Sequence, residues 1–197
     1  MAFVEPIALR GKHAILEPLV EAHLAELKSA AADGELWNLW FTSVPTPTEA
    51  AANIAFRLGE RERGTMMPFV VRRVADNRIV GATTFCNIAA ATRRVEIGYT
   101  WYSQSAQRTA INTEVKLMML KHAFETLDCM AVEFRTHHKN LKSRAAIERL
   151  GAKLDGVLRS HGIDRQGDIR DTYVYSIIAA EWLEVKNRLQ EKLNRPC

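Results

Sequence analysis

Apolar and polar residues repeat with two different periods along this chain, and the pattern is clearest in its central stretch. Residues 93–102 are rich in β-branched and aromatic side chains, which predicts a strand. After a polar loop, residues 110–127 carry apolar side chains at helical spacing over most of the helix surface, and only Lys116 and Lys121 form a narrow polar stripe. Residues 130–136 alternate again. The pattern predicts a strand, a mostly buried helix and a second strand.

Turn residues and shorter apolar runs divide the rest of the chain into further elements. They predict strands at residues 12–19, 67–74, 78–87, 153–161 and 171–178, and helices at 21–32, 46–63, 141–150 and 181–194. The second of these helices would start with a capping box formed by Thr46 and Glu49. Its inward side chains would be Ala52, Ile54, Ala55, Phe56 and Leu58. The helix at 141–150 would be capped by Asn140 and stopped by Gly151.

The order of these elements predicts a mixed α/β (α+β) fold, with a mostly antiparallel central sheet and helices on both of its faces. Three antiparallel strands precede the buried helix, and an amphipathic helix at 181–194 closes the chain with Trp182 on its apolar face. The length fits one domain over residues 1–197. The last helix would pack on its own domain or, in a homodimer, on a second subunit.

Composition narrows the class of function. The net charge of +4 would favour phosphorylated ligands, but it is too small and too scattered to indicate nucleic acid. The three cysteines form no Cys-x-x-Cys pair and the six histidines form no metal pattern, which indicates a reducing compartment and no metal site. No secretory signal and no apolar run long enough for a bilayer is visible, so we expect a cytoplasmic protein that binds neither membrane nor nucleic acid.

The central stretch also carries candidate chemistry. A strand that leads through a polar loop into a helix is a ready anion site, because the first-turn amides of the helix have no partners inside it. A plain βαβ unit of the core would show the same pattern, so the arrangement alone leaves both interpretations open.

Three motifs give the chain a resemblance to a known family. They are Glu96-Ile-Gly-Tyr99, the stretch from Gln107 to Glu114, and Asn140-x-x-Ser143 followed by Glu148-Arg-Leu-Gly151. Together with the element order over residues 8–178, they resemble the GNAT superfamily of acyl-CoA-dependent N-acetyltransferases, and most of all its RimJ/RimL (ribosomal-protein-acetyltransferase) branch. The resemblance implies a GNAT-like fold and transfer of an acetyl group from acetyl-CoA to a primary amine, either a protein N-terminus or a small molecule.

The resemblance also implies a binding site for the co-substrate. In the family, a loop of the form Gln/Arg-x-x-Gly-x-Gly/Ala binds the pyrophosphate of coenzyme A through backbone amides. The matching residues here are Gln107, Arg108, Thr109, Ala110, Ile111, Asn112 and Thr113. Ala110 lacks the freedom of glycine for positive φ, whereas Asn112 tolerates left-handed geometry and can donate to phosphate. Arg108 would add a charge-assisted contact. The family places an asparagine, here Asn140, on the pantetheine arm, with the helix of Ser143 beside it.

Acetyl transfer needs a base for the amine, a polarised carbonyl and a proton for the leaving thiolate. The resemblance points to Glu96 as the base, acting through a water. The alternative is an exposed glutamate that pairs with Arg93 or Arg94. Backbone amides near Tyr99, Thr100 and Trp101 would polarise the carbonyl.

The general acid is less clearly marked. Many family members have a tyrosine where this chain has Ile147, and RimJ/RimL-type sequences lack it too, so Ser143 or a water would replace it. Because this tyrosine is missing and Ala110 and Asn112 depart from the loop pattern, a non-catalytic acyl-CoA-binding module is the alternative function. Glu114 fits a contribution to the helix dipole.

Some side chains allow two interpretations. An aromatic cluster of Trp37, Trp40 and Phe41 would either line the acceptor pocket or close the edge of the core as a short helix. His137 and His138 would point in opposite directions at a strand end and stay solvated or lightly packed. Neither reading identifies the acceptor amine.

Overall fold

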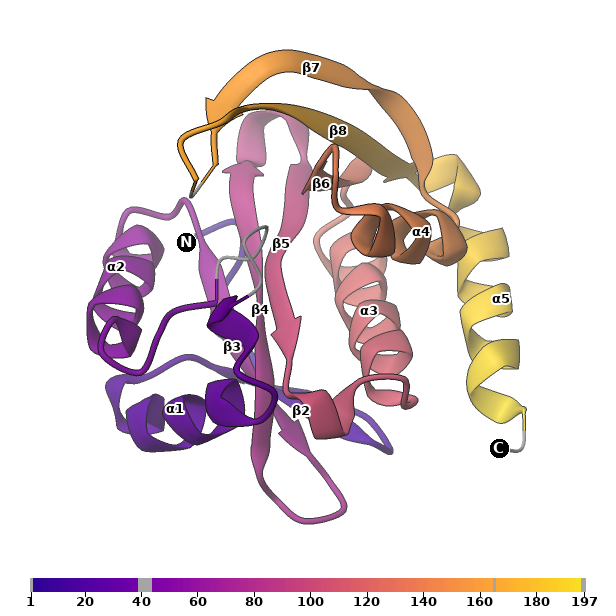
Figure 1. Ribbon diagram of the computed structural model, residues 1–197. Coiled ribbons are helices and arrows are strands. Elements are labelled where there is room, and N and C mark those ends of the chain that lie inside the picture. Colours follow the sequence, from indigo (N-terminus) through magenta and orange to yellow (C-terminus); the bar gives the residue numbers. More distant parts are fainter. Residues whose placement is uncertain (1, 39–43, 165, 196–197) are drawn as a thin grey trace.

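The computed structural model describes residues 2–38, 44–164 and 166–195 (Figure 1). Within these ranges, eight strands form a sheet in the order β1-β2-β3-β4-β5-β6-β8-β7. The strands are β1 (Leu9–Arg10), β2 (Ala14–Pro18), β3 (Met67–Arg73), β4 (Ile79–Ala89), β5 (Arg94–Tyr102), β6 (Ala131–His137), β7 (Lys153–Ile163) and β8 (Ile169–Ile178). Neighbouring strands are antiparallel except β5 and β6, which are parallel. The predicted mostly antiparallel sheet is confirmed.

Helices cover both faces of this sheet. They are α1 (Leu24–Ala32), α2 (Ala50–Glu62), α3 (Ile111–Lys121), α4 (Leu141–Leu150) and α5 (Trp182–Asn194). Figure 1 shows α1 and α2 on one side of the sheet and α3 and α5 on the other. Two apolar clusters correspond to these layers, one around Leu27, Ile54 and Val70 and the other around Phe85 and Val115. No described helix is both long and apolar enough to cross a bilayer.

Capping residues behave as the sequence predicts. The Asn140 side chain accepts a hydrogen bond from the Ser143 amide at 3.0 Å, and Gly151 ends α4 with φ of 103°. Thr46 and Glu49 exchange the two bonds of a capping box, at 2.9 and 3.3 Å. They do so one turn ahead of α2, which begins at Ala50.

The predicted inward face of α2 is right for Ile54, which is buried, and for Leu58, which packs against the core, and wrong for the other three residues. Ala52, Ala55 and Phe56 are exposed, and the Phe56 side chain is 50% accessible. The residues that face the sheet are Ala50, Ile54 and Arg57, spaced as i, i+4 and i+7. Alanines lie on two faces of this helix, so the sequence alone does not show which face is buried. The sheet covers the face with Ile54 and Arg57.

The helix after the polar loop is mostly buried, as predicted, but its detail differs. It runs as α3 to Lys121 and continues as a π-helical turn at His122–Thr126. Lys116 is 5% exposed, so its assignment to a polar surface stripe is wrong, whereas Lys121 is exposed. At the C-terminus, Trp182 of α5 stacks on Phe124 with ring centroids 5.3 Å apart. The terminal helix therefore packs on its own chain.

Glu114 does more than complement the dipole of α3. Its carboxylate is buried and accepts hydrogen bonds from the backbone amides of Lys12, His13 and Ala14 at 2.7 to 2.8 Å. Because these amides belong to the turn between β1 and β2 and to the first residue of β2, Glu114 fastens the first turn of α3 to this hairpin.

The pairing of β5 with β6 sets the position of the site. The two strands pair only from Arg94 to Glu96 against Ala131 to Glu133. Further along, β5 contains a bulge: Tyr99 has φ of 52°, and the register with β4 shifts between Ala82 and Thr84. Beyond Glu96 the strands no longer share hydrogen bonds, and their facing edges line a cleft.

Candidate active site

A cleft of about 1280 Å³ opens where β5 and β6 separate. It is lined by residues 96–102 of β5, the loop and first turns of α3, the start of α4, and the β7–β8 hairpin. Figure 1 shows this hairpin arching across the top of the molecule in that view. Pockets for one drug-sized ligand measure about 300 to 1,000 Å³. The cleft therefore has room for a large co-substrate and a second molecule together.

Glu96 lies in this cleft, at the last position where β5 pairs with β6. Its side chain is 9% exposed and accepts a hydrogen bond from the Asn87 side chain at 2.6 Å. Arg135 lies 3.5 Å from the same carboxylate oxygen. Burial raises the pKa of Glu96, and the bond from Asn87 and the charge of Arg135 oppose that rise. Val95 and Ile97 point into the core. The alternative pairing of Glu96 with Arg93 or Arg94 does not occur, because those arginines contact Asp128 and Glu133.

A second ionisable group of the cleft is Lys116. Its ammonium donates to the Thr100 hydroxyl at 2.8 Å, and that hydroxyl lies 2.8 Å from the hydroxyl of Thr83. Burial lowers the pKa of Lys116 to about 7. A lysine in this state can hold or release a proton near neutral pH.

The loop before α3 and the start of the helix line the cleft through Gln107, Arg108 and Asn112. Arg108 adopts left-handed geometry with φ of 59°, whereas Ala110 has φ of −65° and Asn112 is already helical. Ala110 therefore does not need the positive φ that glycine would allow. The residue of this loop with a left-handed backbone is Arg108, not Asn112. The helix provides no acceptors for its first-turn amides. The Ile111 amide donates to the Thr109 hydroxyl at 3.3 Å.

The start of α4 forms the opposite wall. Asn140 and Ser143 both line the cleft, although the Asn140 side-chain oxygen is also engaged in capping the helix. A capping oxygen leaves the amide nitrogen of the same side chain as a donor. The residue can therefore cap α4 and contact a ligand at the same time.

Comparison with known proteins identifies the family of the chain. A family model described as an acetyltransferase (GNAT) domain matches residues 13–153. The chain belongs to the GNAT acetyltransferase family. The resemblance inferred from the three motifs is confirmed, and the chain is an enzyme, an acetyltransferase.

Individual proteins that are similar to this GNAT chain are acetyltransferases by name. The Bacillus subtilis (strain 168) protein named "Putative ribosomal N-acetyltransferase YdaF" is 27% identical over 170 residues, which cover 85% of this chain and 91% of that protein. A GCN5-related N-acetyltransferase from Brucella melitensis has a similar structure, with a TM-score of 0.83 and 26% identity over 96% of this chain and 86% of that one. Mycobacterium smegmatis RimJ, solved in complex with CoA-disulfide, gives a TM-score of 0.78 at 23% identity, covering 95% and 93% of the chains, a likeness in fold.

The structure brings most of the predicted site residues of this GNAT chain into one cleft. The residues that line it are Glu96, Tyr99, Thr100, Trp101, Gln107, Arg108, Asn112, Asn140 and Ser143. Thr109, Ala110, Ile111 and Thr113 do not: Thr109 bonds to the loop backbone, and Ile111 and Thr113 are buried. Trp37 packs beside the core cluster under α1, and Trp40 and Phe41 lie outside the described residues.

The histidine pair differs from its prediction. The rings of His137 and His138 stack with centroids 4.5 Å apart instead of pointing in opposite directions. His137 is 5% exposed and lies in the cleft wall, 3.6 Å from Asp164. Burial lowers the pKa of His137, which favours the neutral ring. Among the residues that the structure describes, no group of three His, Cys, Asp or Glu side chains could hold a metal ion.

Sequence reasoning missed three residues that shape the cleft chemistry. Asn87 and Arg135 reach Glu96 only because of strand register, since β4 pairs Cys86 with Glu96 and β6 lies on the other side. Lys116 was visible in the sequence as the one charged residue among buried helix positions 111–120 other than Glu114. The local signal of its burial lies one turn further along the helix, where Met119 and Leu120 are apolar, whereas Asn112 and Thr113 one turn earlier are polar.

Proposed function

We propose that the protein transfers the acetyl group of acetyl-CoA to a primary amine, at a protein N-terminus or on a small molecule, with Glu96 as general base. The observation that carries the proposal is the position of Glu96. Its carboxylate is buried at the point where β5 and β6 separate, in the same cleft as the N-terminus of α3. The name of the B. subtilis relative and the CoA complex of the RimJ neighbour support this choice of reaction.

The described residues fit such a co-substrate. Bound acetyl-CoA supplies the acetyl group as a thioester. The Asn112 amide and the Arg108 side chain, which lie at the N-terminus of α3 and line the cleft, would hold its phosphates, since helix N-termini favour anions. The side-chain amide of Asn140 would contact the pantetheine arm, and the cleft leaves space for the amine beside it.

The remaining roles follow from the walls of the cleft. Glu96 would take a proton from the incoming ammonium, directly or through a water, because a carboxylate with a raised pKa accepts a proton more readily near neutral pH. The bulge removes Tyr99 and Thr100 from the ladder with β4, so amides of this segment would stabilise the developing oxyanion. Ser143 or a water would return a proton to the thiolate.

The test of the base is Glu96→Gln, which keeps the shape of the side chain and removes its basicity. We expect kcat/KM for thiol release to fall by about 100-fold or more, within the usual contribution of general-base catalysis, while calorimetry shows acetyl-CoA affinity changed by less than about threefold. The control is Glu191→Gln, an exposed glutamate of α5 that does not line the cleft. Equal turnover by wild type and Glu96→Gln would refute the assignment.

The test of the co-substrate site uses Asn140→Asp and Asn112→Asp. Aspartate caps a helix as well as asparagine, so Asn140→Asp should leave thermal stability unchanged and still weaken acetyl-CoA by removing the amide donor. Asn112→Asp would place a negative charge beside the phosphates and weaken binding more. Unchanged affinity in both variants would place the co-substrate elsewhere.

A further inference from the structure

The carboxylate of Glu96 is held on one of its two oxygens. The Asn87 side-chain amide donates to Oε2 at 2.6 Å, and the closest approach of the Arg135 guanidinium, 3.5 Å, is to the same oxygen. No nitrogen of the described residues donates a hydrogen bond to Oε1. Oε1 is also not one of the buried polar atoms without a partner, so solvent in the cleft reaches it. The two oxygens therefore differ in what can approach them.

Glycine at position 98 leaves room for the second oxygen. Gly98 lies on the same face of β5 as Glu96 and lines the cleft. A Cβ at this position would lie 2.9 Å from Oε1 of Glu96 and 3.0 Å from the sulfur of Cys86, and Cβ atoms essentially never come within 2.9 Å of another atom. Oε1 thus lies beside a cleft residue that has no side chain to cover it.

A bulge in β4 brings Asn87 to the carboxylate. Cys86 pairs with Glu96, so regular alternation would turn the next residue, Asn87, to the opposite face of the sheet. Asn87 instead has φ of 46°, and the register with β5 shifts between Cys86 and Ala89. Asparagine tolerates this left-handed geometry, and its amide reaches Oε2 as a result.

Arg135 is shared between two carboxylates of neighbouring strands. Glu96 on β5 pairs with Glu133 on β6, and Arg135 follows two residues later on the same face as Glu133. The Nε atom of Arg135 binds Oε1 of Glu133 and lies 3.5 Å from Oε2 of Glu96. Burial raises the pKa of Glu96, the bond from Asn87 and the charge of Arg135 lower it, and the charge of Glu133 raises it. Arg135 and Glu133 therefore act on the base with opposite sign.

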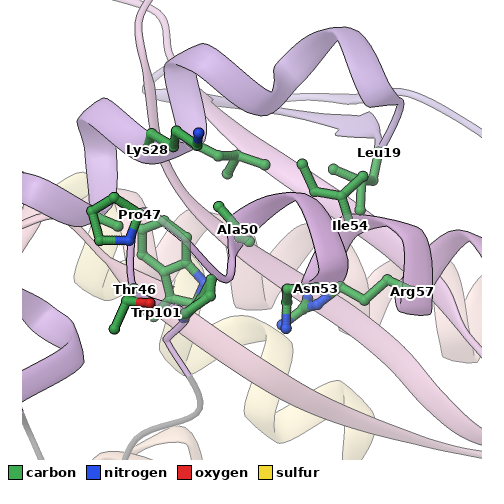
Figure 2. Close-up of a pocket in the computed structure, with 13 residues that line it drawn as sticks. Leu19, Lys28, Thr46, Pro47, Ala50, Asn53, Ile54, Arg57 and Trp101 are labelled. Carbon is green, nitrogen blue, oxygen red and sulfur yellow. The ribbon is translucent and has the colours of Figure 1, made fainter.

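The other titratable groups around Glu96 do not supply a competing charge. Arg57 of α2 lines another cavity, of about 20 Å³ (Figure 2), and its hydrogen bond goes to a threonine of β4. Lys116 of α3 donates to a threonine of β5. Burial raises the pKa of Cys86 and of Tyr99, so both stay neutral near pH 7. The charges that act on Glu96 come from β6.

We propose that Arg135 is a positioning residue for the base. Together with Asn87 it holds Oε2 of Glu96, so that Oε1 is the oxygen that takes the proton from the acceptor. This inference rests on the proposed role of Glu96 as general base. In the step, an N–H bond of the acceptor ammonium breaks and an O–H bond forms at Oε1, directly or through a water that gives up one proton and gains another. A neutral amine and a carboxylic acid result.

The test follows the ionisation of Glu96 in variants of its two charged neighbours. An opposite charge within about 4 to 6 Å lowers the pKa of an acid by about 1 to 3. Arg135 is 34% exposed and shared with Glu133, so we expect Arg135→Met to move the acid limb of the pH profile of kcat/KM to higher pH by about 0.5 to 1. Below the limb this is a loss of rate of about three- to tenfold. Arg135→Lys should restore part of the change, and Glu133→Gln should move the limb to lower pH.

Arg94→Met is the matched control. Arg94 contacts Glu133, as Arg135 does, but it does not line the cleft and forms no ion pair with Glu96. Its removal should leave the acid limb in place. Carbon-13 NMR of the free protein with labelled glutamate measures the pKa of Glu96 without turnover, and the resonance is assigned by its loss in Glu96→Gln. The pKa should move in each variant as the acid limb does.

The assignment of Oε1 has a test of its own in Gly98→Ala. Because Oε2 is held, the carboxylate cannot turn away from the added Cβ without losing its partners. We expect kcat to fall by about tenfold or more, while calorimetry shows acetyl-CoA affinity changed by less than about threefold. Full activity of Gly98→Ala would overturn this assignment.

Three results would overturn the role of Arg135. They are an unchanged Glu96 pKa in Arg135→Met, movement in the same direction in Arg135→Met and Glu133→Gln, and an equal loss of rate at every pH, which an arginine that only supports the fold would give. A fourth result distinguishes this inference from the proposed function. If NMR shows the expected changes in the Glu96 pKa and the acid limb does not move, Glu96 is not the base, and the hold of Arg135 on Oε2 stands.

Discussion

Removing the Glu114 carboxylate should destabilise the protein by an amount that can be worked out from its contacts. The carboxylate accepts one amide hydrogen bond through Oε1, from Lys12, and two through Oε2, from His13 and Ala14. A hydrogen bond to a charged group contributes about 1.5 to 3 kcal/mol. Ala14 is fully buried, so its amide would lose its partner without gaining water, whereas the other two amides are partly buried and can be solvated. We expect Glu114→Ala to cost about 3 to 5 kcal/mol of unfolding free energy.

Glu114→Gln separates hydrogen bonding from packing. The single oxygen of glutamine can serve the His13 and Ala14 amides, but its NH₂ group would then face the Lys12 amide, donor against donor. We therefore expect about half the loss seen in Glu114→Ala. The measurement is urea denaturation followed by tryptophan fluorescence, with stability taken from the midpoint and slope. Glu191→Ala, at an exposed position of α5, should change stability by less than about 0.5 kcal/mol.

Gly11 provides an independent check on the same contact. A side chain there would place Cβ 2.5 and 2.8 Å from the two Glu114 carboxylate oxygens, too close for any real contact. Gly11→Ala should therefore destabilise the wild type and do so less when Glu114 is already alanine, a coupling that a double-mutant cycle measures. Equal effects of Gly11→Ala in both backgrounds, or a Glu114→Ala protein within 1 kcal/mol of wild type, would refute the reasoning.

Two further predictions concern stability. Burial gives Lys116 a pKa of about 7 against 10.5 when unfolded, so the unfolded chain binds more protons between these values and stability should rise with pH there, by up to about 1.4 kcal/mol per pH unit from this group. Lys116→Met should remove this rise of stability with pH between pH 7 and 8.5, and the control Lys121→Met, at an exposed position, should keep it. The range ends at pH 8.5 because burial raises the pKa of Cys86, so that this thiol would add its own pH dependence at higher pH. Gly151→Ala should lower the free energy of unfolding by about 1 to 2 kcal/mol, because Gly151 has φ of 103° and an added Cβ would meet the side chains of Val185 and Arg188. An unchanged denaturation midpoint would contradict this.

Local signals were enough to predict the elements that depend on local chemistry. The sequence marks α4 at both ends, since Asn140 provides an acceptor for a first-turn amide and Gly151 tolerates the left-handed geometry that ends the helix. The β3–β4 hairpin likewise follows from two β-rich runs around a turn at Asp76 and Asn77, where Asn77 has positive φ. These residues determine structure within a few positions of themselves.

Orientation on a helix could not be predicted in the same way. Helical periodicity identifies a face by its apolar residues, and α2 offered Phe56 and several alanines against a face with Ile54 and Arg57. Contacts with the sheet determine which face is buried: the Thr84 hydroxyl accepts a hydrogen bond from Arg57, and the guanidinium lies over the ring of Tyr99. Lys116 shows the same limit, because its partner Thr100 is brought to it by a different element. A buried cation is recognised by its tertiary partners, which no local pattern shows.

The cleft itself depends on where strand pairing stops. A parallel pair that continued along β5 and β6 would have satisfied the backbone groups of both strands and filled the space between them with side chains. Pairing with β6 ends at Glu96, and Gly98 shares the face of Glu96 by ordinary alternation. The bulge at Tyr99 then reverses the alternation, so that Trp101 comes to this face too. The lost ladder bonds are a loss of stability that the rest of the sheet has to offset. In return, the carboxylate of Glu96, the proposed base, shares one cleft with Arg108 and Asn112 at the N-terminus of α3. The sequence marks this point only by the motif Glu96-Ile-Gly-Tyr99.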